Sequence, residues 1–136
     1  MTLSLINAIR TTMVDAIVDS LDAGSGAGTI AIRSGSRPTL PTDTATGSLL
    51  VTITCADPAF GAGSNGVATI SDPAAQNAVA TATATWFRAF DSDGNAKFDG
   101  SVTATGGGGD LTLASTSITS GQPVDITGGT ITVPAS

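Results

Sequence analysis

The chain has 136 residues, enough for one domain that removes roughly two thirds of its unfolded surface from water. Only 12% of its residues are charged and 40% are apolar; 11 acids, all Asp, against five basic residues give a net charge of −6. The sequence contains no His, Tyr or Glu, so it has no imidazole to act as a base or metal ligand near neutral pH. The acidic balance disfavours a nucleic-acid-binding protein, and the few catalytic side chains favour a structural or binding protein over an enzyme.

Residues 3–21 carry the apolar spacing of an α-helix. The apolar positions step by three, four, four and four residues, which predicts one helical stripe. Its members are Ile6, Ile9, Met13, Ile17 and Leu21. Thr2 or Ser4 is placed to cap the start of this helix, and the glycines of residues 24–28 end it.

The chain therefore divides into an N-terminal helix (residues 1–23), a Gly-rich joint (24–28) and a single β-domain (29–136). Two places for the helical stripe remain open, the protein's own sheet and a neighbouring subunit. Because a Gly/Ser/Ala joint sets no fixed angle between helix and sheet, we favour the neighbouring subunit. The candidate interface residues on the helix are Ile6, Ile9, Met13 and Ile17.

No targeting or membrane-spanning segment is predicted. The N-terminal stretch lacks the Lys/Arg-bearing start of a secretory signal, and Arg10, Asp15, Asp19 and Asp22 interrupt its apolar run. No run approaches the ~20 apolar residues needed to cross a bilayer.

After Gly28 the apolar period changes to two, in Thr/Val/Ile-rich runs separated by Gly, Pro, Asp and Ser. Strands are predicted at residues 29–34, 48–55, 67–70, 78–90, 96–104, 110–113, 124–127 and 130–133. The residues expected to face inward are Ile30 and Ile32; Leu49, Val51 and Ile53; Phe98 and Val102; Leu111 and Leu113; Val124 and Ile126; Ile131 and Val133. Because strands follow one another without βαβ alternation, we expect a mainly β fold, a β-sandwich or jelly-roll-like domain with one N-terminal α-helix.

Asp91 to Asn95 joins two aromatic-bearing runs and contains Asp-Gly, which predicts a β-hairpin. Asp91, Asp93 and Asn95 also have the alternating spacing of a calcium loop. Ala and Val occupy positions 96 and 102, where an EF-hand needs Gly and Glu, so a turn is favoured and no metal or cofactor is assigned.

Three further features have a structural and a functional interpretation. Cys55 is in phase with the apolar residues before it, which favours a buried, unreactive thiol. Trp86 and Phe87 are candidate aromatic contacts for a sugar ring or a subunit, although core positions are favoured for them. The Thr/Ala strand around residues 81–85 has a weakly defended edge. Its candidate interface residues are Thr81, Thr83 and Thr85.

Several stretches together carry a resemblance to known proteins. They are GTIAIRSGSRP (28–38), LLV (49–51) followed by DPAFG (57–61), WFRAFDSDG (86–94) and TITVP (130–134). Placed after an N-terminal helix and a Gly-rich joint, they resemble, over essentially the full chain, a widespread group of small, mostly uncharacterised tailed-bacteriophage proteins. The resemblance implies a virion component, a head decoration (cement) protein or part of a head or tail fibre, that assembles without cofactors. It supplies no functional residue.

These observations lead us to expect a non-enzymatic capsid decoration protein that stabilises contacts between major capsid subunits. Such a protein would lie on the capsid exterior after synthesis in the host cytoplasm. The alternative is a fibre or receptor-binding module that contacts a host glycan through Trp86 or residues 37–47. The expected partners are the major capsid protein and further copies of the chain, a trimer before a dimer, with no nucleic acid and no membrane.

Overall fold

The computed structural model describes residues 3–136. In that range the chain begins with helix α1 (Asn7–Asp19), which continues into a short 3-10 turn, η1 (Ser20–Asp22). The strands that follow are β1 (Thr29–Arg33), β2 (Leu49–Thr54), β3 (Val67–Thr69), β4 (Gln76–Asn77), β5 (Ala82–Thr83), β6 (Trp86–Phe90), β7 (Ala96–Ala104), β8 (Leu111–Leu113), β9 (Ser117–Ile118), β10 (Pro123–Val124) and β11 (Ile126–Thr132).

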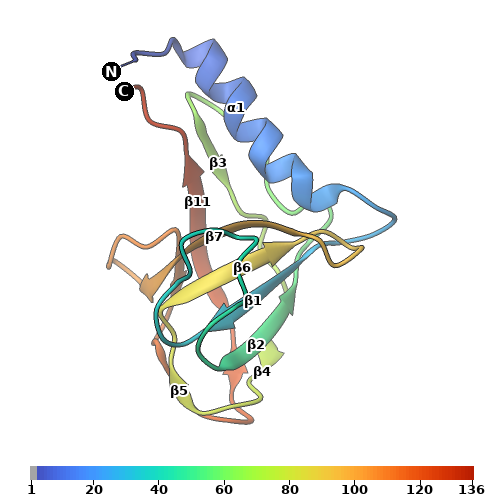
Figure 1. The fold of residues 1–136 in the computed structure, drawn as a ribbon, viewed down its shortest axis with the longest axis vertical. Coiled ribbons are helices and arrows are strands. Elements are labelled where there is room, and N and C mark those ends of the chain that lie inside the picture. The colour runs from blue at the N-terminus through green and yellow to red at the C-terminus, as the bar shows by residue number, and fades with distance from the viewer. Residues whose placement is uncertain (1–2) are drawn as a thin grey trace.

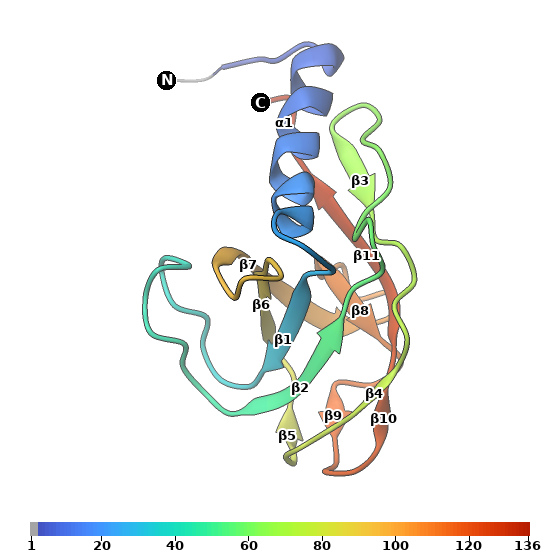
Figure 2. The same cartoon turned by 90° about the vertical axis from the view of Figure 1, so that its right-hand side faces the viewer.

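Seven strands form one mixed sheet in the order β2-β1-β6-β7-β8-β11-β3, and β10-β4 and β5-β9 form two small sheets. Helix α1 lies beside β3 and β11 at one end of the molecule (Figures 1 and 2). The fold is mainly β with one N-terminal helix and is compatible with a β-sandwich-like domain, which confirms the predicted fold class. The hairpin of β6 and β7 is also confirmed, because these strands pair antiparallel across the Asp91–Asn95 turn.

The helix begins without a side-chain cap. Ile6 occupies the N-cap position and makes no capping hydrogen bond. The prediction that Ser4 caps the helix is therefore wrong, and Thr2 lies outside the described residues. The first turn instead has a tertiary anchor, because the Leu5 N–H donates to the Ala135 carbonyl at 2.8 Å.

A β-bulge in β2 corrects the predicted inward face of that strand. Ile32 pairs with Val51 but Arg33 pairs with Leu49, so Leu50 is an extra residue between them. The bulge turns Leu50 into the core, fully buried, and leaves Leu49 36% exposed. Strict alternation, which placed Leu49 inward, cannot describe a strand with an inserted residue.

β7 and β8 run parallel although only residues 105–110 separate them. Parallel neighbours usually need a crossover of a dozen or more residues. Here Gly106 and Gly108 adopt φ of +87° and +83°, and a Cβ added at Gly109 would lie 2.9 Å from the Thr103 nitrogen. The glycine run of residues 106–109 therefore forms a tight return loop, after which β8 can pair parallel with β7.

Two other predicted strand boundaries differ from the structure. Residues 78–90 contain two separate strands, β5 and β6. Of the predicted strands at 124–127 and 130–133, Val124 belongs to β10, and the rest merge into the continuous strand β11, which ends at Thr132. Gly128 and Gly129, which suggested a turn, lie inside β11. A Cβ at Gly129 would come within 3.1 Å of Ile70 Cγ2, so that glycine allows close packing between neighbouring segments.

Candidate functional site

Helix α1 has two apolar faces, and only one of them is covered. Val14 and Val18 on the inner face, together with Leu21 of η1, are at most 1% exposed and belong to the core. On the outer face a row of large apolar side chains reaches solvent. We call this row the outer stripe; it consists of Ile6 at the N-cap and Ile9 and Met13 in the helix, which are 67%, 48% and 42% exposed. Leu3, 61% exposed, lies in the non-helical segment before them.

The predicted helical stripe is thus divided between the two faces. Ile6, Ile9 and Met13 are exposed, whereas Ile17 is partly buried against the core and Leu21 is fully buried. Steps of four residues advance by slightly more than a full turn, so a row of such steps winds slowly around the helix. A second apolar row, Val14, Val18 and Leu21, has spacings of four and three, and it was the signal that could have identified the inner face.

Polar contacts fix α1 to the β-domain along its length. Arg10 Nε donates to the Val133 carbonyl at 2.9 Å, and Asp15 Oδ1 accepts the Gly63 N–H at 2.6 Å. Beyond the helix, Asp22 Oδ1 accepts the Ala59 N–H at 2.9 Å. The outer stripe is therefore presented on a helix with a defined orientation.

The segment after the helix is also held, contrary to the prediction of a joint that leaves the helix free. Ser92 Oγ accepts the N–H groups of Ser25 and Gly26 at 3.1 and 3.3 Å and donates to the Ala23 carbonyl at 3.3 Å. Gly28 is buried so closely that an added Cβ would lie 2.5 Å from the Phe90 carbonyl oxygen. Glycine at position 28 therefore serves close backbone approach.

Trp86 and Phe87, the candidate aromatic contacts, are each only 1% exposed. Trp86 Nε1 donates to the Ser34 carbonyl at 3.0 Å, and the Arg88 guanidinium lies 5.4 Å from the indole centroid. Phe87 meets Phe98 edge to face, with ring centroids 6.1 Å apart. The hypothesis that Trp86 or Phe87 stacks on a sugar is therefore wrong for this fold, since neither ring reaches the surface.

Arg88 is a buried cation that binds the loop between β1 and β2. Its Nε and Nη2 donate to the two carboxylate oxygens of Asp99 at 2.7 and 2.9 Å. It also donates to the carbonyls of Asp43 and Leu40, at 2.7 and 3.3 Å. The hydrogen bond to Asp99 raises the pKa of Arg88 against the opposing effect of burial, so the pair stays ionised and holds the loop against the sheet.

The candidate interface threonines 81, 83 and 85 are all exposed, but two of them make hydrogen bonds within the chain. Thr81 Oγ1 accepts the Ser120 N–H at 2.9 Å, and Thr85 Oγ1 donates to the Gly35 carbonyl at 2.6 Å. β5 itself pairs with β9. The strand edge at residues 81–85, which the sequence suggested was weakly defended, is therefore partly paired within the chain.

The Asp91 carboxylate organises the hairpin turn. Its Oδ1 accepts the N–H groups of Asp93 and Asn95 at 3.0 and 2.9 Å, and its Oδ2 lies 3.2 Å from Lys97 Nζ. The backbone hydrogen bond from Asn95, followed by the contacts of Lys97, lowers the pKa of Asp91. Among residues 3–136, no group of three or more His, Cys, Asp or Glu side chains is placed to hold a metal ion.

Cys55 is buried, as predicted, at the end of β2. Desolvation, and then the nearby charge of Asp22, raises the pKa of its thiol to about 11. A thiol with that pKa is almost entirely protonated at neutral pH and is a poor nucleophile.

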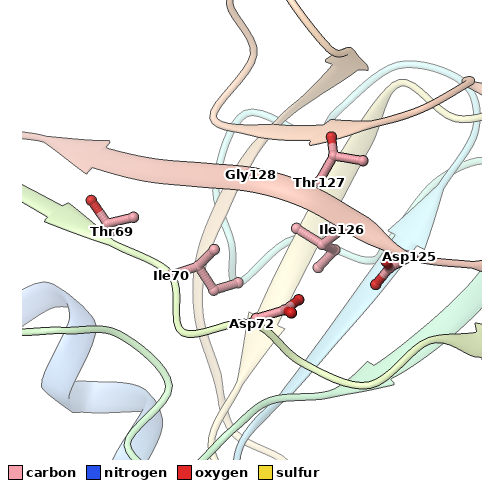
Figure 3. Close-up of a pocket in the computed structure, with 7 residues that line it drawn as sticks. All are labelled: Thr69, Ile70, Asp72, Asp125, Ile126, Thr127 and Gly128. Carbon is pink, nitrogen blue, oxygen red and sulfur yellow. The ribbon is translucent and has the colours of Figure 1, made fainter.

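An open groove lies where β3 diverges from the first half of β11 (Figure 3). It has a volume of about 440 Å³, and Ile70 and Ile126 form its apolar floor. Asp72 and Asp125, both exposed, stand at one end. The remaining lining residues are Thr69, Thr127 and Gly128.

No protein-family model, curated protein or solved structure matches this chain. In the part of the chain that the structure describes, no helix is long and apolar enough to span a bilayer. The candidate site therefore rests on the geometry of the molecule, and the outer stripe of α1 is its most distinctive surface feature.

Proposed function

We propose that the protein is a non-enzymatic structural component of a virus particle, a capsid decoration protein that stabilises contacts between major capsid subunits. The observation that carries this proposal is the outer stripe. Three of the seven exposed large apolar side chains among the described residues lie in this one row. Grouped exposed apolar residues on a soluble domain mark protein–protein contact surfaces.

Two further observations support an assembly role. α1 is fixed to the β-domain by Arg10 and Asp15, and just beyond the helix by Asp22, so its outer face is ordered before any partner binds. A pre-ordered surface loses little conformational entropy on association. The buried charges and thiol, Arg88, Asp99 and Cys55, have structural surroundings that also favour a non-enzymatic role.

A fibre module that contacts host glycan is the alternative implied by the resemblance. One of its two candidate glycan contacts, Trp86, is buried and cannot reach a glycan. Residues 37–47 do lie mostly at the surface, with Leu40 55% exposed, so a glycan contact by this loop stays a prediction. Its fixed backbone, held by Arg88, offers a rigid platform.

The test uses capsids assembled without this protein. We expect the purified chain to bind them at saturable sites and to raise the temperature at which they release DNA. The matched variants Ile9→Asp and Val79→Asp place the same charge on and off the outer stripe, since Ile9 and Val79 are both exposed. Capsids that bind no protein, or whose stability is unchanged by saturating protein, would contradict the proposed function.

A further inference from the structure

We infer that the outer stripe of α1 packs against the outer stripes of other copies of this chain, so that the protein associates with itself helix to helix. The inference deepens the proposed function, on which it rests in taking the stripe as a protein–protein surface, by naming the partner that covers it. The occupant of the stripe is a second copy of the chain, and capsid subunits then meet the assembled copies. Three properties of the stripe lead to this choice.

The first property is its spacing. Ile6, Ile9 and Met13 are followed by the exposed Ala16, which gives steps of three, four and three residues. These are the a and d positions of a heptad repeat, the pattern by which identical helices pack side by side. Such a row is self-complementary, because each side chain meets the same row on the partner helix.

The second property is the absence of charge within the stripe of the described helix. The whole chain carries −6, so two copies repel each other over most of their surfaces. Arg10, beside the stripe, is engaged with the Val133 carbonyl and with Asn7 Oδ1, at 2.9 Å each. Asp15 turns away from the stripe to bind Gly63. Contact along the stripe therefore buries no charge from its own members, and Arg10 and Asp15 are already engaged within the chain.

The third property is the size of the stripe. It is one helical ridge a few side chains long, whereas a standard interface covers about 800 Å² on each partner. A single pair of ridges covers less than this, but a closed ring lets each ridge contact two neighbours at once. We therefore expect more than two copies around the α1 helices.

Sedimentation equilibrium of the full chain, without capsids, measures this association directly. We expect a mass above the 13.2 kDa of one chain for the natural sequence and for Val79→Asp. Ile9→Asp, and independently Met13→Asp, should weaken association at least tenfold. Ile9 and Met13 are 48% and 42% exposed and lie outside the core cluster, so we expect both variants to fold. Circular dichroism melts confirm folding for each variant.

Any oligomer that Ile9→Asp and Met13→Asp dissociate and Val79→Asp leaves intact supports the inference. A monomer at all concentrations overturns it, as does an oligomer insensitive to both stripe substitutions. Capsid binding by a monomer would overturn the inference and leave the proposed function standing. A stripe-dependent oligomer that never binds capsids would support the inference and overturn the proposed function.

Discussion

Arg88 joins the hairpin of β6 and β7 to the loop between β1 and β2, which is distant in the sequence. Its side chain and that of Asp99 are 6% and 5% exposed, so the ion pair is almost fully desolvated. Truncating one partner of such a pair leaves a buried charge without compensation. We expect Arg88→Met to lower the free energy of unfolding by about 3–5 kcal/mol, measured by urea denaturation.

The matched control is Arg37→Met, because Arg37 is exposed on the same loop. Its effect should stay within about 0.5 kcal/mol. The double variant Arg88→Met, Asp99→Asn should recover part of the loss, since it removes the unpaired carboxylate as well. Equal effects of Arg88→Met and Arg37→Met would show that the pair contributes nothing to folding.

Cys55 makes the stability depend on alkaline pH. Burial raises the pKa of its thiol from 9.0 to about 11 in the folded chain. A raised folded-state pKa means that the folded state holds its proton more strongly than the unfolded state, so the contribution is complete below pH 9 and is lost as the pH rises towards 11. We expect the free energy of unfolding to fall over this window, with a smaller fall in Cys55→Ala. Parallel slopes for the two proteins would contradict the assignment.

The elements of the fold were predictable to different degrees, for physical reasons. The helix and β7 were predicted well because their periodicity is long and regular. β4 and β9, of two residues each, have no periodicity to detect and depend on tertiary partners. The bulge at Leu50 follows from the shape of the neighbouring strand, which a sequence pattern does not contain.

The candidate site was partly predictable at the same scale. Ile6, Ile9 and Met13 were chosen from helical spacing, and they are exposed. The assignment of Ile17 and Leu21 to the same stripe failed because the packing of Val14 and Val18 sets the rotation of the helix on the sheet. That rotation is a tertiary property, decided by what the inner face meets at β3 and β11.

The two faces of the helix should respond differently to truncation. Leu21 is fully buried in the core, with 0% of its surface exposed to solvent. Leu21→Ala should therefore lower the free energy of unfolding by about 2–5 kcal/mol. Met13→Ala, at a position 42% exposed, should change it by no more than about 0.5 kcal/mol. Chemical denaturation of the dilute, dissociated protein measures both. Similar losses would mean that the inner and outer faces are assigned incorrectly.

The segment that follows the helix offers a second pair of variants. A Cβ at Gly28 would lie 2.5 and 2.8 Å from the carbonyl oxygens of Phe90 and Leu21, whereas a Cβ at Gly26 would meet nothing within 4 Å. We expect Gly28→Ala to destabilise the protein by about 1–3 kcal/mol through overpacking. Gly26→Ala should be neutral or slightly stabilising, because alanine restricts the unfolded chain. Thermal melts of the two variants distinguish close packing from a freely flexible joint.

At the scale of the whole molecule, net charge opposes the contact that the outer stripe favours. Each copy carries −6, and raising ionic strength from about 0.01 to 1 M shortens the screening length from about 30 to 3 Å. We expect the associated fraction at fixed protein concentration to increase with NaCl, since apolar contact is not weakened while repulsion is screened. Light scattering across a salt series measures this. A decrease with salt would indicate an interface built from ion pairs.

The return loop between β7 and β8 also has a consequence for the order of folding. Val102 meets Leu111 only nine residues further along the chain, whereas Thr69 of β3 meets Thr130 of β11 across 61 residues. Short loops close at a lower entropic cost than long ones, so β6, β7 and β8 can assemble as a local nucleus. The β3–β11 pairing, against which α1 packs, must then form late. The ribosome thus synthesises the residues of the helix first, but the helix can be positioned only last, after the final strand is released. Assembly of copies then follows completion of each one.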